Sequence, residues 1–200
     1  MNFIKITLQS GKDHSLKRFH PWVFSGAIKK ISGEVQEGDI VEVYSAQQEF
    51  LGMGHFQIGS IAVRMFSFEQ VIPDFEFWKS KIQRAFDFRT QLDLTHNAVT
   101  NCYRLCFGEG DGLPGFIIDF YSGTAVFQTH SIGMHFLKPT FVKALQEVMG
   151  DQLLAVYDKS EDTMPKQAPV KAPNGYLWRS EQAKAETVAL ENGHKFLVDW

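Results

Sequence analysis

The first 70 residues contain short segments in which apolar and polar side chains alternate. This period of two places every second side chain on one face of a strand, and it predicts strands at Phe3–Leu8, Ile40–Tyr44 and Ile61–Phe66. A fourth apolar run, Phe50–Phe56, contains two glycines and predicts a strand that bends sharply. Four or five short strands joined by Gly-rich turns predict a small β-barrel that ends near residue 70.

The pattern changes after residue 70, where Pro73 and Asp74 introduce an amphipathic helix with Phe75 and Trp78 on its apolar stripe. Further along, the chain predicts three strands, a second helix and another strand, at residues 102–107, 116–121, 124–130, 137–149 and 153–159. Ser122-Gly123 predicts a tight hairpin turn, and the second helix can serve as a crossover. We therefore expect a mixed sheet with two helices.

The expected fold class is α+β, with a barrel at residues 1–70, a central α/β domain at 71–184 and a hairpin at 185–200. The hairpin is predicted by two alternating runs about Asn192-Gly193. Because the chain stops inside an apolar strand of this hairpin, we expect a piece of a longer protein, cut before a further domain. Residues 160–175 lack periodicity and contain Pro165, Pro169 and Pro173, which predicts a mobile loop or a connection.

Composition excludes several classes of protein. A net charge of −3 and a pI near 6.2 exclude a protein that coats nucleic acid by charge alone. No apolar run approaches the ~18 residues that a membrane span needs. Cys102 and Cys106 are expected on one face of a strand as buried free thiols, which indicates a reduced, cytoplasmic protein.

The segment from Arg18 to Ile28 combines cations, an imidazole and aromatic rings around a proline. Such side chains can grip phosphates and stack on bases. Residues 1–31 hold six Lys/Arg against one acid, whereas residues 32–69 hold six acids against Arg64, which predicts a domain with one basic face. Trp22 either stacks on a base or closes the core, and its apolar neighbours favour the core. The candidate RNA-contacting residues are Lys17, Arg18, His20, Trp22, Lys29 and Lys30.

A second constellation is the turn Gly108-Glu-Gly-Asp-Gly112, which does not open a helix and so does not predict a nucleotide-binding loop. Glu109, Asp111 and Asp119 could converge for metal or acid/base chemistry, or Asp111 could simply form the turn. Arg104 could instead pair with Glu109 or Asp111 and hold the loop against a neighbouring domain. The seven histidines show no ligand spacing, so no metal site is predicted, and His130 and His135 are expected at the surface.

Four segments form a recognisable set: Arg18-x-His-Pro-Trp-Val-Phe-Ser-Gly-Ala-Ile28, Arg104-Leu-x-x-x-Glu-Gly-Asp-Gly-Leu-Pro-Gly115 with Ile118-Asp119-x-Tyr121, Tyr157-Asp-Lys-Ser160, and Glu191-Asn-Gly-x-x-Phe196. In this order they resemble the class I S-adenosylmethionine-dependent methyltransferases that carry an N-terminal PUA domain and methylate a cytosine C5 in large-subunit ribosomal RNA. The resemblance implies a PUA barrel, a central α/β domain and a Rossmann-like domain of which only the opening hairpin is present.

The resemblance also implies that S-adenosylmethionine and the catalytic cysteine belong to the missing domain, so this fragment would hold no catalytic, cofactor-binding or metal residue and would be inactive. Its role would be RNA recognition, with Arg104, Glu109, Asp111 and Asp119 in interdomain or substrate-positioning contacts. Ribosomal RNA is the expected partner, no membrane is, and a homodimer is compatible with the sequence. The alternatives are a stand-alone RNA-binding protein and a small hydrolase that uses Glu109, Asp111 and Asp119.

Overall fold

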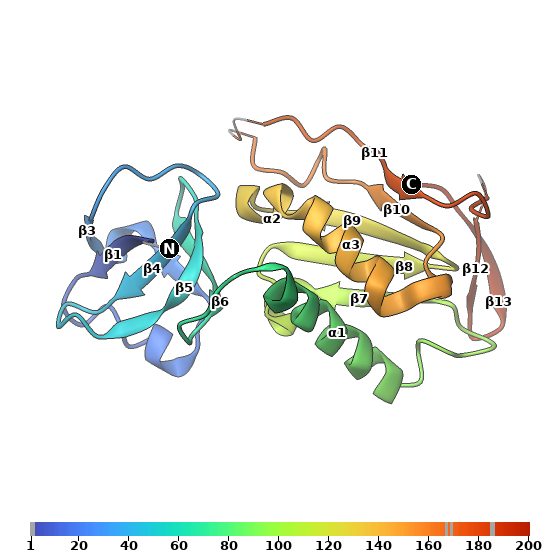
Figure 1. Ribbon diagram of the computed structural model, residues 1–200, viewed down its shortest axis with the longest axis horizontal. Helices are drawn as coiled ribbons and strands as arrows, with labels where there is room; N and C mark the ends of the chain where they lie inside the picture. Colours follow the sequence, from blue (N-terminus) through green and yellow to red (C-terminus); the bar gives the residue numbers. More distant parts are fainter. Residues whose placement is uncertain (1–2, 167, 169, 185–186) are drawn as a thin grey trace. The chain divides into compact units, whose positions relative to one another are not determined.

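The computed structural model describes residues 3–166, 168, 170–184 and 187–200, and these form two compact units (Figure 1). The first unit extends to Ile72 and also includes Ser131–Phe136, and the second consists of Pro73–His130 and Leu137–Trp200. The sequence-based division places 131–136 in the central domain, whereas these residues, which contain the short helix α2 (Ile132–Phe136), group with the first unit. Of the predicted segments, residues 1–2, Pro169 and 185–186 lie outside the described residues.

The first unit is built on a six-stranded sheet in the order β2-β6-β5-β4-β1-β3. Its two edge strands, β2 and β3, follow one another in the chain and are joined only by Ser25–Ala27, so the sheet must curl. The core between its strands includes Ile6, Val41 and Val63, none of which is exposed. The strands are β1 (Ile4–Leu8), β2 (Trp22–Phe24), β3 (Ile28–Ile31), β4 (Ile40–Tyr44), β5 (Phe50–Phe56) and β6 (Ile61–Ser67).

Strands β2 and β3 are absent from the sequence prediction. β3 reads Ile-Lys-Lys-Ile, which breaks the alternation that identifies a strand. The structure explains the pattern: Lys30 pairs with Thr7 and Ile28 pairs with Leu8, so Lys29 is the extra residue of a β-bulge. The bulge lets Ile28 and Ile31 pack against the core while both lysines remain exposed.

The second unit has a five-stranded sheet in the order β11-β10-β9-β8-β7, and helices α1 and α3 cover one of its faces (Figure 1). Asp74 caps α1 by accepting a hydrogen bond from the Phe77 amide at 3.0 Å. The Phe141 ring of α3 stacks on Phe116 of the sheet with centroids 4.4 Å apart. The elements are α1 (Phe75–Gln91), β7 (Cys102–Phe107), β8 (Phe116–Tyr121), β9 (Thr124–Thr129), α3 (Lys138–Met149), β10 (Ala155–Asp158) and β11 (Gly175–Arg179).

One expectation for this unit is wrong. On the neighbouring strand β8, Cys102 pairs with Tyr121 and Cys106 pairs with Ile118. These two partners are three residues apart rather than four, because the register of the strands shifts at Leu105. The two thiols, both free, therefore lie on opposite faces of the sheet rather than on one. In addition, β11 is a short edge strand that the sequence did not predict.

The C-terminal hairpin consists of β12 (Thr187–Glu191) and β13 (His194–Val198), joined by Asn192 and Gly193 with φ values of 51° and 82°. Positive φ at both turn positions is the geometry expected for Asn-Gly. Ala189 is buried, but Val188, Phe196 and Leu197 are 48%, 49% and 71% exposed, so much of the apolar surface of this hairpin is uncovered. Among the described residues, no helix is long and apolar enough to cross a membrane.

Candidate nucleic-acid interface

The edge strand β2 presents aromatic side chains outward. Val23 is 2% exposed and belongs to the core, whereas Trp22 is half-buried and Phe24 is 49% exposed, because neighbouring residues of a strand point to opposite faces. His20 lies just before the strand, with its ring centroid 5.7 Å from that of Trp22 and 6.2 Å from that of Phe24. We call His20, Trp22 and Phe24 the aromatic patch.

The preference for Trp22 as a core residue is therefore wrong. The apolar run from Pro21 to Phe24 contributes Val23 to the core, and the alternation of the strand turns Trp22 and Phe24 the other way. The neighbouring strand adds a cation to the patch, since Arg64 of β6 pairs with Trp22 and its guanidinium carbon lies 5.7 Å from the centroid of the Trp22 ring. Arg64 was not a candidate, although it is the single cation in an acidic stretch.

Phe19 lies directly before the aromatic patch in an uncommon conformation. Its φ is +61°, in the left-handed region that a bulky residue rarely adopts. Phe19 is 72% exposed, and its ring packs edge-on against the Phe68 ring with centroids 5.2 Å apart. Residues with a backbone of this kind cluster at active sites and ligand clamps.

The candidate cations divide into two kinds. Lys17 is held by two acids, with its Nζ atom 2.7 Å from a Glu49 oxygen and 3.0 Å from an Asp13 oxygen. These two hydrogen bonds raise the pKa of Lys17, and the bond with Glu49 has the larger effect. The positive charge of Lys17 is therefore already compensated within the protein. Arg18, Lys29 and Lys30 are exposed and have no ion-pair partner among the described residues.

The turn from Gly108 to Asp111 is fixed by a buried ion pair. Arg89 of α1, 7% exposed, binds both carboxylate oxygens of Asp111 at 2.5 and 2.8 Å. The same carboxylate accepts a hydrogen bond from the Phe107 amide at 2.6 Å, and Arg89 Nε donates to the Arg104 carbonyl at 2.9 Å. Asp111 therefore shapes the turn, and sequence reasoning missed Arg89, whose position on the buried face of α1 is the one signal that could have identified it.

The pairing predicted for Arg104 is wrong. Arg104 lies opposite Asp119 on neighbouring strands, and its guanidinium binds both carboxylate oxygens of Asp119 at 2.8 and 3.1 Å. Asp111 and Asp119 are thus held by different arginines, and Glu109 is half-buried in the turn. Because two of its three acids are neutralised separately, the structure gives no support to a hydrolase built on this set.

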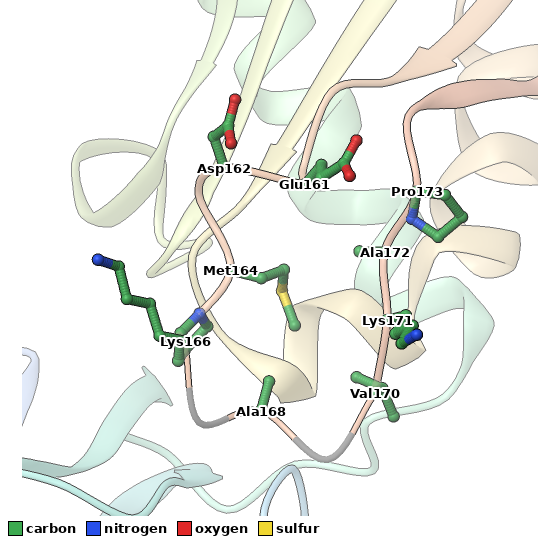
Figure 2. Close-up of a pocket in the computed structure, with 10 residues that line it drawn as sticks. Glu161, Asp162, Met164, Lys166, Ala168, Val170, Lys171, Ala172 and Pro173 are labelled. Atoms are coloured by element: carbon green, nitrogen blue, oxygen red, sulfur yellow. The ribbon is translucent and has the colours of Figure 1, made fainter.

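Other candidate sites also lack a reactive constellation. No group of three or more His, Cys, Asp or Glu among the described residues is placed to hold a metal ion. His130 and His135 are half-buried, not at the surface as expected. Described residues of the 160–175 segment, among them the buried Met164, line a pocket of about 640 Å³ (Figure 2). The charged side chains that line this pocket are exposed and of mixed sign: Glu161, Asp162, Lys166 and Lys171.

Comparison with known proteins identifies the first unit. Residues 6–68 match the family model of the PUA-like domain. The chain carries a PUA-like domain. It is 35% identical over 196 residues to the ribosomal RNA large subunit methyltransferase I of Pseudoalteromonas translucida, and 31% identical over 198 residues to that of Yersinia pseudotuberculosis. These alignments cover 97% and 98% of this chain but 48% and 49% of the relatives, so the chain spans about half the length of the curated relatives it matches.

Solved structures show the same fold. A protein from Streptococcus mutans, assigned as a SAM-dependent methyltransferase, superposes with a TM-score of 0.77 over 96% of this chain and 47% of its own, at 21% identity. A second structure with the same scores, assigned as a methyltransferase, is complexed with SAH. The two-unit α+β architecture is therefore shared with proteins of about twice this length.

Proposed function

We propose that this chain is the RNA-recognition and substrate-positioning part of an S-adenosylmethionine-dependent ribosomal RNA methyltransferase whose target is a cytosine C5 of the large subunit. The observation that carries the proposal is the aromatic patch, in which Phe24 is 49% exposed and Arg64 lies beside the half-buried Trp22, on a PUA-like domain in a chain similar to large-subunit rRNA methyltransferases. The cytosine C5 target is supported by the four-segment resemblance. The free thiols fit the reduced, cytoplasmic setting expected of such a protein.

RNA binding should depend on salt through three cations rather than four. With Arg18, Lys29 and Lys30 on phosphates, log K should fall with log salt at a slope of roughly −2 to −3, from about −0.7 to −0.9 per contact. Alanine at each of the three should flatten the slope by just under about one unit, largely regardless of RNA sequence. Filter binding at several salt concentrations measures this. Lys17→Ala is the matched control, and a flattening as large as that of Lys29→Ala would contradict the assignment.

The chain should not bind S-adenosylmethionine. Among the residues that the structure describes, no glycine-rich loop leads from a strand into a helix whose amide groups could hold the methionine carboxylate, since the Gly108–Asp111 turn continues into β8 rather than a helix. In the proposal the cofactor belongs to a part of the protein outside residues 1–200. Calorimetry of the 200-residue chain with S-adenosylmethionine should show no heat of binding. Micromolar affinity would contradict the assignment of the cofactor to another part of the protein.

A further inference from the structure

Lys81 of α1 is a largely buried lysine without an acid partner. The second unit buries three cationic side chains among its described residues, Lys81, Arg89 and Lys138, which are 6%, 7% and 4% exposed. Arg89 has Asp111 and Lys138 has Asp158 as partner. No carboxylate or other hydrogen-bond acceptor of the described chain lies within bonding distance of Lys81 Nζ, which is instead 5.1 Å from the centroid of the Phe77 ring. Lysines are rarely this buried unless they are paired, so the position of Lys81 needs a reason.

The surroundings of Lys81 increase the positive potential rather than offset it. Burial is the main cause that lowers its pKa to about 8, and the guanidinium of Arg84, one turn further along α1, lowers it as well. Cys106 of β7 is also close, but burial raises the pKa of this thiol to about 12, so it is neutral at physiological pH. The nearby acid Asp111 is already taken by Arg89.

The ammonium lies against the turn at Gly112. A Cβ atom at Gly112, whose φ is +69°, would be 3.1 Å from Lys81 Nζ, closer than ordinary packing allows. Glycine at position 112 adopts the left-handed backbone without strain, and its lack of a side chain leaves room for the Lys81 ammonium. The Arg89–Asp111 pair fixes the same turn from the helix, so Gly112 is held next to the Lys81 ammonium.

We propose that Lys81 and Arg84, at the turn that ends at Gly112, bind the phosphate of an RNA backbone or of a free phosphorylated ligand. A phosphate supplies the negative charge that no described side chain provides, and hydrogen bonds to charged groups are the stronger ones. Binding of an RNA phosphate at this site rests on the proposed function, whereas binding of a free phosphorylated ligand does not.

The test is ¹³C NMR of the lysine ε-carbons in the full 200-residue chain. Inorganic phosphate should raise the pKa of Lys81 from about 8 toward its ordinary value. Lys81→Met should weaken phosphate binding about tenfold or more and leave thermal stability equal or higher, because it removes an uncompensated buried charge. Lys79→Met is the control, since Lys79 already pairs with Glu147 at 2.6 Å. The proposal would be overturned if phosphate leaves the Lys81 signal unshifted, or if Lys81→Met binds phosphate as tightly as the wild type.

A second titration separates this site from the proposed function. If a short RNA shifts the Lys81 signal as inorganic phosphate does, the backbone is the source, and if inorganic phosphate alone does so, the ligand is a free phosphate. A third outcome is that RNA binds through the aromatic patch while neither phosphate nor RNA shifts the Lys81 signal. This result would refute the phosphate site but not the proposed RNA-binding function.

Discussion

Asp158→Asn should destabilise the chain by about 3–5 kcal/mol, because it leaves a buried lysine without its counter-charge. Lys138 and Asp158 are each 4% exposed and form an ion pair, and the second carboxylate oxygen accepts a hydrogen bond from Ser160. The network fastens the start of α3 to the end of β10. A thermal melt should show a midpoint lower by roughly 6 °C or more, at ~2–8 °C per kcal/mol for domains of this size range.

The pH dependence identifies the cause. Burial lowers the pKa of Lys138 in the folded chain, and Asp158 opposes that shift. Without Asp158, the pKa of Lys138 in the folded chain falls further below its unfolded value of 10.5. At a pH between these two pKa values, the unfolded chain binds more protons than the folded chain. The free energy of unfolding therefore rises with pH in this range. The deficit of Asp158→Asn should therefore shrink toward pH 10. Lys138→Met/Asp158→Asn should recover much of the loss, and a double variant as unstable as the single one would refute this explanation. Glu147→Gln, a surface control, should melt close to the wild type.

The regular strands and helices were predictable from sequence, and the short strands β2 and β3 of the candidate nucleic-acid interface were not. β1, β4 and β6 contain five to seven mostly apolar residues, which is long enough to be recognised as strands. β2 has three residues and β3 contains a bulge, so neither shows that period. The prediction for Trp22 failed for the same reason, since hydrophobicity alone does not say which face of an unrecognised strand a side chain takes.

Ion-pair partners were the second failure, because they depend on tertiary structure. Arg104 meets Asp119 through the register of two strands, and Asp111 meets Arg89 across 22 residues of sequence. Lys17 pairs with Asp13 one helical turn away, but its shorter contact is with Glu49, from a distant segment. Sequence identified residues that carry charge, and only the fold shows which charges remain available for a ligand.

Removing rings from the aromatic patch should weaken RNA binding without unfolding the chain. A stacked base is worth about 1–3 kcal/mol by alanine substitution, which is about 5–150-fold in affinity. Phe24→Ala is the clearest variant, because its ring is 49% exposed. Trp22→Ala should cost a similar amount of binding and less stability than the about 3–5 kcal/mol of a core tryptophan. The salt slope should stay unchanged, since neither ring carries a charge.

The matched control is Phe88→Ala, which removes a ring of similar exposure, 52%, from α1 in the other unit. The decisive measurement is the affinity of a labelled single-stranded RNA for the wild type, Phe24→Ala and Phe88→Ala, by fluorescence anisotropy at several salt concentrations. The account predicts that Phe24→Ala binds at least about fivefold more weakly with the wild-type salt slope, and that Phe88→Ala binds like the wild type. Equal affinity for Phe24→Ala and the wild type would contradict the assignment of β2 as the RNA-binding surface.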